Sequence, residues 1–191
     1  MPQKVDHRRA LAERNAAGIL DAVERLLARG GTLNMAAVAA EAGVSRPTLY
    51  AHYGTINHLV EAVVERYVTR STTAFAAART EDGPADEALE RLLEASWGRL
   101  ADFHGLLRVA TEHLTPAVVQ RTHHTMMAPL DALIERGRGE GRFRTDVPAG
   151  WLQTMYFQLV HGAAEYAARE GVPRDEALAW LRATARSVYL A

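Results

Sequence analysis

An all-α fold is predicted by three features of the sequence. Apolar residues recur three and four positions apart along most of the chain, which is the period of an amphipathic helix. No segment shows the alternation of apolar and polar residues that is typical of a half-buried strand. Glycine and proline stand mainly between the periodic stretches, where helices begin and end. With 191 residues, 48% of them apolar, the chain can bury a substantial core in about nine helices.

Three helices are predicted at the N-terminal end. The first covers residues 8–29 and stops at two consecutive glycines. Asn34 is an N-cap candidate for the second, MAAVAAEA, which ends at Gly43, where glycine permits a left-handed turn. Ser45 can cap the third, and Pro47 suits its first turn because an N–H there would have no partner within the helix.

Six further helices are expected. The fourth begins near Thr55 or Ile56 and runs to about Ala78, long enough to leave the first group of helices. The remaining five are expected over residues 86–103, 104–114, 116–136, 149–169 and 173–190. We expect Thr115 to cap the helix that starts at Pro116. Glycines at 137, 139 and 141 are expected to break the helical pattern.

The chain is expected to divide into two parts. Residues 1–60 hold the first three helices, and residues 61–191 form a larger helical domain. The segment RTEDGPADE combines charge, glycine and proline, so it marks a break in the helical pattern between the two parts. The fourth helix joins them.

Composition excludes several kinds of protein. The absence of cysteine excludes disulfides, thiolate zinc sites and cysteine nucleophiles. No signal peptide or run of about 18 apolar residues occurs, so we expect a soluble protein, with no membrane partner and the cytoplasm as its default location. The net charge of -1 hides an asymmetry: residues 1–60 contain 7 Lys and Arg against 5 Asp and Glu, and the rest of the chain contains 15 against 18. The small basic excess therefore lies at the N-terminal end.

The second and third helices have the features of a helix-turn-helix. The small apolar residues Val38, Ala39 and Ala42 allow close helix packing, and a glycine makes the corner. Leu49 faces inward, which leaves one outer face of the third helix free to enter a major groove. That face carries Arg46, Pro47, Thr48 and Tyr50. Arginine can pair with a guanine edge, proline can pack on a thymine methyl, and hydroxyls can reach phosphates.

The string VAAEAGVSRPTLYAHYG, preceded by ILDAVERLLARGG, resembles the N-terminal domain of TetR-family regulators. The resemblance covers about 50 residues, and the rest of the chain agrees in helix count and length. It implies a repressor that binds palindromic operator DNA as a homodimer and is released by a small-molecule inducer. It places Arg46 and Pro47 on bases, Thr48, Tyr50 and His52 on phosphates, and Ser45 as the helix cap. With the N-cap candidate of the second helix, the expected DNA-binding set is Asn34, Ser45, Arg46, Pro47, Thr48, Tyr50 and His52.

Two departures from the family pattern affect the expected DNA contacts. Ile56 stands where family members usually place a lysine that holds the DNA backbone, and Ala36 and Ala37 leave the second helix without side-chain donors. We therefore expect few phosphate contacts, a shallow salt dependence of binding, and an unusually large share of base readout on Arg46.

The last two predicted helices are apolar on more than one face, so each needs two packing partners. We expect one side to pack within the domain and the other against a second copy, in a four-helix interface as the resemblance implies. The expected dimer residues are Leu152, Leu159, Val160, Ala163, Leu178, Trp180, Leu181 and Ala185.

A ligand pocket is expected among the middle helices, where bulky, adaptable and polar side chains occur together. Its candidate residues are Trp97, Phe103, His123, Met126, Met127, Met155, Tyr156 and His161. Each is individually as compatible with plain core packing. We expect the ligand to act on the DNA-reading heads through the fourth helix. The loop GRGEGRFR is expected to be solvated.

Other functions are less well supported by the sequence. The histidines of the second part, His104, His113, His123, His124 and His161, could bind metal in a metal-dependent regulator or an enzyme. Adjacent His123 and His124 point about 100° apart on a helix, and no HExxH, phosphate-binding glycine loop or nucleophile elbow occurs. We expect no catalytic residues, no cofactor and no metal. A ligand-independent DNA-binding protein or an activator of the same fold stays open as an alternative.

Overall fold

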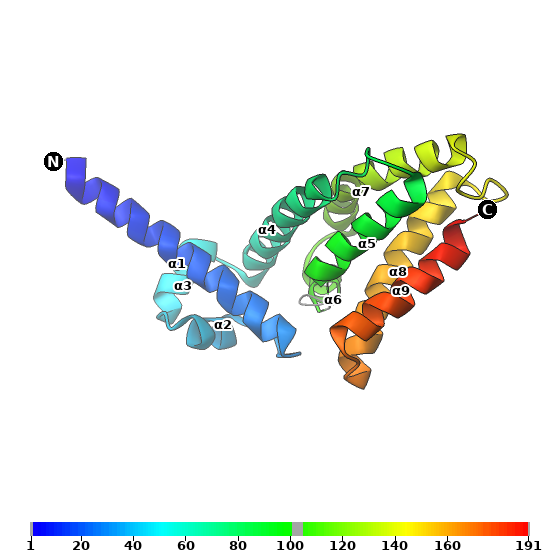
Figure 1. Cartoon of the computed structure of the whole chain (residues 1–191). Helices are drawn as coiled ribbons and strands as arrows, with labels where there is room; N and C mark the ends of the chain where they lie inside the picture. The colour runs from blue at the N-terminus through cyan, green and yellow to red at the C-terminus, as the bar shows by residue number, and fades with distance from the viewer. Residues whose placement is uncertain (1, 101–104, 191) are drawn as a thin grey trace. The chain divides into compact units, whose positions relative to one another are not determined.

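The computed structural model describes residues 2–100 and 105–190, and the side chains of all of these except residues 2–9, 99, 100 and 120–125 (Figure 1). The described residues form nine α-helices, joined by short loops and one isolated bridge between Phe143 and Leu190. The helices are α1 (Pro2–Ala28), α2 (Met35–Ala42), α3 (Arg46–Tyr53), α4 (Ile56–Ala77), α5 (Ala85–Leu100), α6 (Leu106–His113), α7 (Pro116–Gly139), α8 (Ala149–Glu170) and α9 (Arg174–Tyr189). The predicted all-α class is confirmed.

As far as they are described, the residues fall into two compact units. The first unit contains the chain up to Arg66 and the segment Gly105–Val119, and the second contains Tyr67–His104 and Gln120–Ala191. Helix α4 therefore contributes its first part to one unit and its second part to the other. Helix α6 belongs to the unit that carries α1, α2 and α3, a grouping that a single division after residue 60 does not include.

The helix ends of the first unit follow from their capping residues. Asn34 accepts a hydrogen bond from the backbone N–H of Ala37 at 2.9 Å, and Ser45 accepts one from Thr48 at 3.2 Å. Gly43 ends α2 with φ at +66°, in the left-handed region that favours glycine. The three predicted boundary residues are confirmed, and the turn between α2 and α3 is set by the sequence itself.

The prediction that Gly137 breaks a helix was wrong. Helix α7 continues through it to Gly139. The reason for the glycine is close packing, because a Cβ at Gly137 would lie only 2.6 Å from Cε2 of Phe143, whose ring is buried. Gly137 therefore admits an aromatic ring against the helix backbone, and the chain turns only at Gly141, where φ is +69°.

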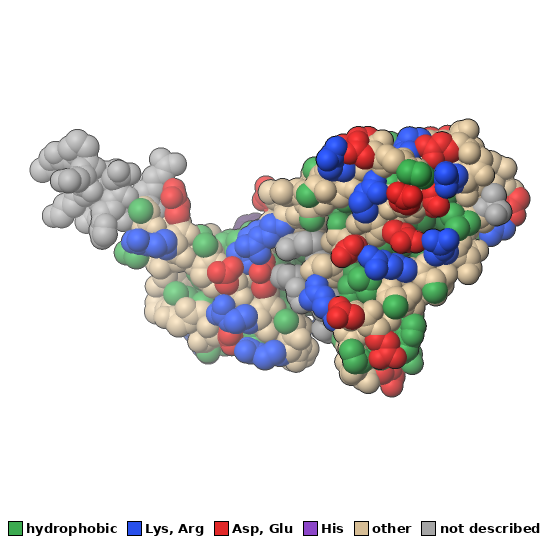
Figure 2. Space-filling model, viewed as in Figure 1, with side chains coloured by type: hydrophobic (Ala, Val, Ile, Leu, Met, Phe, Trp, Pro, Cys, Tyr) green, Lys and Arg blue, Asp and Glu red, His purple; other side chains and the backbone are tan. Residues whose placement is uncertain are grey.

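The second unit is held by α5, α8 and α9, which pack against one another. Leu89, Leu92 and Leu93 of α5 are buried in its core, and the hydroxyl of Tyr189 donates to the carbonyl of Leu152 at 2.7 Å. Positive and negative side chains alternate over the surface of this unit (Figure 2). Some join α5 to α9, such as Arg186 with Glu90 at 2.7 Å.

The arginines of the loop GRGEGRFR bond within the unit. Arg142 pairs with Asp86 at 2.8 Å, Arg144 pairs with Asp146 at 2.7 Å, and Arg138 donates to the carbonyl of Val147. Their role is to fasten the loop and not to present a basic surface. Among the described residues, no helix is long and apolar enough to cross a bilayer.

Candidate nucleic-acid interface

Helix α3 presents one polar face because its opposite face is anchored in the core. Leu49 has no exposed surface, whereas Arg46, Pro47 and Tyr50 are exposed. The ring of Tyr50 is 51% exposed, which is high for a large aromatic side chain. A helix of 8 residues with one buried leucine thus carries its arginine and its tyrosine on the free side.

Arg46 has no ion-pair partner among the residues whose side chains are described. Its guanidinium is available for a bidentate contact with a guanine. Thr48 and His52 are half-buried, and the hydroxyl oxygens of Thr48 and Ser45 lie 2.7 Å apart, so each already has a partner within α3. This pairing fixes the first turn and reduces the freedom of Thr48 to reach a phosphate.

Glu41 joins α2 to α1 and neutralises part of the local basic charge. Its carboxylate accepts from Arg25 at 2.8 Å and from Arg29 at 2.6 Å. These hydrogen bonds, chiefly the one from Arg25, lower the pKa of Glu41 below its ordinary value. Sequence reasoning missed this cluster. The spacing of four between the two arginines, on one face of α1, was the available signal.

The start of α4 is fixed to the rest of the first unit. Thr55 accepts from the backbone N–H of His58 at 3.2 Å and so caps the helix. One turn further, Asn57 bonds His113 of α6 at 3.2 Å. At the end of the unit, Arg66 pairs with Asp21 of α1 at 2.8 Å and also with Glu24. The geometry ties α4 and α6 to the helix that supports α2 and α3.

The predicted ligand residues that the structure describes lie mostly in the core of the second unit. Trp97, Met126, Met127 and Tyr156 are buried. The Trp97 indole donates to the carbonyl of Arg174 at 3.1 Å, which gives that ring a structural role.

Two further polar groups surround Tyr156. Its hydroxyl lies 2.6 Å from that of Ser96, and burial raises the pKa of Tyr156 above its ordinary value. Met155 and His161 are half-buried, and His161 lies against the ring of Phe157 with centroids 4.1 Å apart.

Two ligand candidates, Phe103 and His123, cannot be placed. Phe103 lies outside the described residues, and His123 belongs to the part of α7 whose side chains are not described. The same holds for His104 and His124, so the metal alternative stays a prediction. Among the described side chains, no three potential ligands of a metal ion lie together.

The predicted dimer residues divide into two sets. Leu152, Val160, Leu181 and Ala185 are buried against their own chain, because both helices turn these side chains into the core of the unit. They have no surface left for a partner in this conformation. Leu159, Ala163 and Leu178 are half-buried, and Trp180 is 48% exposed.

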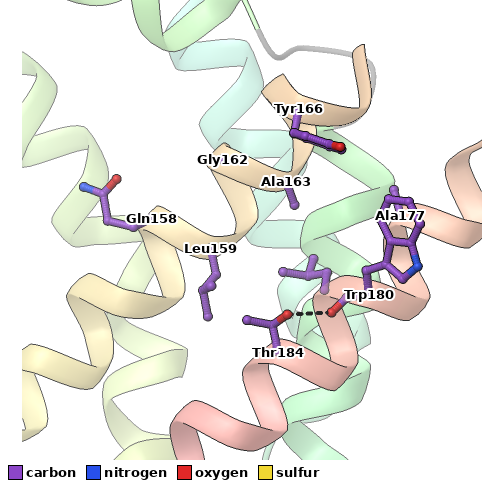
Figure 3. A pocket seen from close by; sticks show the side chains of 9 residues that line it. Gln158, Leu159, Gly162, Ala163, Tyr166, Ala177, Trp180 and Thr184 are labelled. Atoms are coloured by element: carbon purple, nitrogen blue, oxygen red, sulfur yellow. Dashed lines mark hydrogen bonds between the residues drawn. The ribbon is translucent and has the colours of Figure 1, made fainter. Parts of the chain in front are cut away.

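The half-buried and exposed members border a groove of about 220 Å³ between α8 and α9 (Figure 3). It is lined by Gln158, Leu159, Gly162, Ala163, Tyr166, Ala177, Trp180, Leu181 and Thr184. Tyr166, which sequence reasoning did not select, is 47% exposed here. Its place four residues after Gly162 continues the same helix face and was the signal for it.

Comparison with known proteins agrees with this geometry. Residues 19–63 match the model of bacterial regulatory proteins of the tetR family. The HTH-type transcriptional repressor LfrR of Mycolicibacterium smegmatis is 27% identical over 166 residues, which cover 86% of this chain and 84% of the relative. The HTH-type transcriptional regulator NfxB of Pseudomonas aeruginosa is 28% identical over 129 residues, covering 67% and 69%.

Solved structures show the same fold. A TetR-family regulator from Agrobacterium tumefaciens aligns with a TM-score of 0.76 at 21% identity, over 94% of this chain and all of that one (100%). LfrR in complex with proflavine aligns with a TM-score of 0.71 at 23% identity, over 93% and 98%. A helix-turn-helix unit followed by a helical domain of this kind defines a DNA-binding transcriptional regulator, which is not an enzyme. The chain belongs to the TetR family.

Proposed function

We propose that this regulator is a repressor that binds a palindromic operator as a homodimer and is released by a small-molecule inducer. The observation that carries the proposal is the free outer face of α3, with an unpaired Arg46 and an exposed Tyr50 beside a buried Leu49. Operator DNA lies in the cytoplasm of a bacterium, so the cytoplasm is the proposed place of action.

The DNA contacts are assigned by the capping and exposure of α3. Arg46 and Pro47 contact bases in the major groove, and Tyr50 and His52 reach the flanking phosphates. Asn34 and Ser45 act mainly by fixing the ends of α2 and α3. Since Glu41 engages two arginines of α1, few cations remain for phosphates, which supports a shallow salt dependence.

The dimer interface is proposed on the outer side of α8 and α9. Trp180 and Tyr166 expose large apolar surfaces beside the groove, and Leu159 and Ala163 complete it. Apolar side chains of this size are costly to leave in water, and pairing with a second copy would cover them. A twofold dimer would set two α3 helices about 34–36 Å apart, on successive major grooves.

The inducer is proposed to bind in the core of the second unit and to act through α4 and α6. Trp97, Met126 and Met127 supply an apolar surface, and the Tyr156–Ser96 pair supplies polar groups. Helix α4 is shared by both units, and α6 packs with the DNA-reading unit. A solved relative, LfrR, is complexed with proflavine, which supports a ligand site in this fold.

Selection of bound sequences from a pool of random duplexes tests the proposal. The expected result is a palindrome whose half-sites lie one helical turn apart, about 10–10.5 base pairs from centre to centre, or a multiple of it. Sedimentation of the free protein at micromolar concentration should give a dimer. A single non-repeated motif, or a monomer in solution, would contradict the dimer. Enrichment of no sequence would contradict operator recognition.

A further inference from the structure

Ser71 is an unexplained polar residue in the second part of α4. Its side chain has no exposed surface, and among the described residues it is the one buried hydroxyl without a hydrogen-bond partner. Leaving a hydroxyl unpaired in a protein core costs about 1–3 kcal/mol, so such a group is expected to have a use. An alanine would fill the same place without this cost.

Other hydroxyl groups lie on the same side of α4. Tyr67 is one turn before Ser71, so the two residues share a helix face. Tyr67 lies close enough to Tyr156 of α8 for its charge to raise the pKa of Tyr156, whose own hydroxyl pairs with Ser96 of α5. The known polar neighbours on this side are therefore uncharged groups from three helices.

Helix α4 is anchored at both ends of the segment that carries Ser71. On the N-terminal side Arg66 pairs with Asp21 and Glu24 of the first unit. On the C-terminal side Arg91 and Arg136 hold the connection that follows α4. They donate to the carbonyls of Ala78 (3.0 Å), Arg79 (3.1 Å), Thr80 (2.6 Å), Asp82 (2.5 Å) and Gly83 (2.8 Å). A displacement at Ser71 is thus passed to Arg66 and the helix that supports the DNA-reading unit.

We propose that Ser71 is the ligand-sensing residue of the regulator: an inducer that hydrogen-bonds its hydroxyl must separate α4 from the helices that cover it. This inference rests on the proposed function, and it assigns the residue through which that function is regulated. Because Ser71 has no exposed surface, the ligand can bind it only in a conformation in which α4 has moved. Binding to the moved state alone is what shifts a population away from the DNA-bound form.

The site also defines the chemical class of the ligand. The surrounding core is apolar, and the buried polar groups described around it are hydroxyls. A formal charge placed there would lose its hydration without a described counter-charge. The ligand is therefore a largely apolar, uncharged molecule that carries one hydrogen-bonding group, such as a carbonyl, directed at Ser71.

The absence of cysteine from the chain allows a test that needs no knowledge of the natural inducer. Ser71→Cys places a single thiol at the site, and Thr72→Cys, on the exposed side of the same helix, is the matched control. Each variant is treated with uncharged N-ethylmaleimide or with negatively charged sulfonatoethyl methanethiosulfonate. Labelling rates are measured with and without the selected operator duplex, and helical content is followed by circular dichroism.

The uncharged reagent should label Ser71→Cys in the free protein, and operator DNA should slow this reaction. The charged reagent should react far more slowly at position 71, relative to the rates of both reagents at position 72. Labelled Ser71→Cys should keep its helical content and lose operator affinity roughly 5- to 150-fold, the range of typical allosteric coupling, whereas labelled Thr72→Cys should bind normally.

The inference fails if the thiol at position 71 never reacts in the folded protein, reacts equally with the charged reagent, unfolds the chain when labelled, or leaves operator affinity unchanged. The proposed function fails by a different result, namely no operator binding by the unlabelled wild-type chain. The two failures are therefore distinguishable.

Discussion

Arg46 combines the properties that sequence readout requires of a single residue. It stands in the first turn of a helix whose N-terminus Ser45 fixes at 3.2 Å, and it has no ion-pair partner among the described side chains. An arginine held at such a helix end and left unpaired loses little rotamer freedom and no existing ion pair when it meets a guanine. Specificity is therefore expected to depend on this side chain more than on its neighbours.

Replacing Arg46 with alanine should weaken operator binding by about 1–3 kcal/mol and relax specificity at one position of each half-site. Fluorescence anisotropy with the selected duplex and its single-base variants measures both effects. Arg169→Ala removes an exposed arginine of the second unit and serves as the control, which should bind as the wild type does. Uniform weakening on all duplexes would instead assign Arg46 to the phosphate backbone.

Glu41 gives the first unit a dependence of stability on pH. Its pKa is lowered in the folded chain by Arg25 and Arg29, so its ion pairs stabilise the fold above the pKa of the unfolded chain. This contribution should be lost as the pH falls through the lowered pKa. The thermal midpoint of wild type should therefore exceed that of Glu41→Gln at neutral pH, and the two should converge in acid. A difference that is the same at all pH values would contradict the role of the charge.

At the scale of elements, the sequence predicted the DNA-reading helices well and the later ones less completely. Asn34, Gly43 and Ser45 act through local capping, which a short sequence window contains. Gly137 could not be interpreted in the same way, because its partner Phe143 approaches through a turn and packs on the helix in three dimensions. Local signals therefore specify helix ends, and tertiary packing decides the exceptions.

Gly137→Ala should destabilise the fold by about 1–3 kcal/mol, because the added methyl overlaps the buried Phe143 ring. Gly139→Ala is the matched control in the same helix, with nothing within 4 Å of its added Cβ, and should be neutral or stabilising. Urea unfolding measures both variants. Equal stabilities would show that the ring moves away at no cost.

At the scale of the whole molecule, the sequence indicated which helices form an outer face but not which of their residues lie on it. Periodicity marked α8 and α9 as apolar on several sides, yet Leu152 and Leu181 are buried within the unit while Trp180 and Tyr166 are exposed. The orientation of a helix that is apolar all round depends on what packs against it, and α5 takes one side. The ligand residues were uncertain for the same reason, since Trp97 and Tyr156 serve the core and a pocket equally well.

Trp180→Glu should convert the dimer into a monomer at micromolar concentration, because it places a charge in the proposed α8–α9 interface. The substituted side chain is 48% exposed in the single chain, so the fold itself should persist. Trp151→Glu is the control, since Trp151 is 54% exposed and does not line the groove. Sedimentation and operator affinity are measured together. A Trp180→Glu dimer with normal operator binding would place the interface elsewhere.

The most direct measurement of the central claim is equilibrium binding of the selected palindromic duplex and of a scrambled duplex of equal composition, at moderate ionic strength. Because α3 presents an unpaired arginine and an exposed tyrosine to the groove, the palindrome should bind at least about a thousandfold more tightly. Equal affinity for the two duplexes would contradict sequence-specific recognition by this helix.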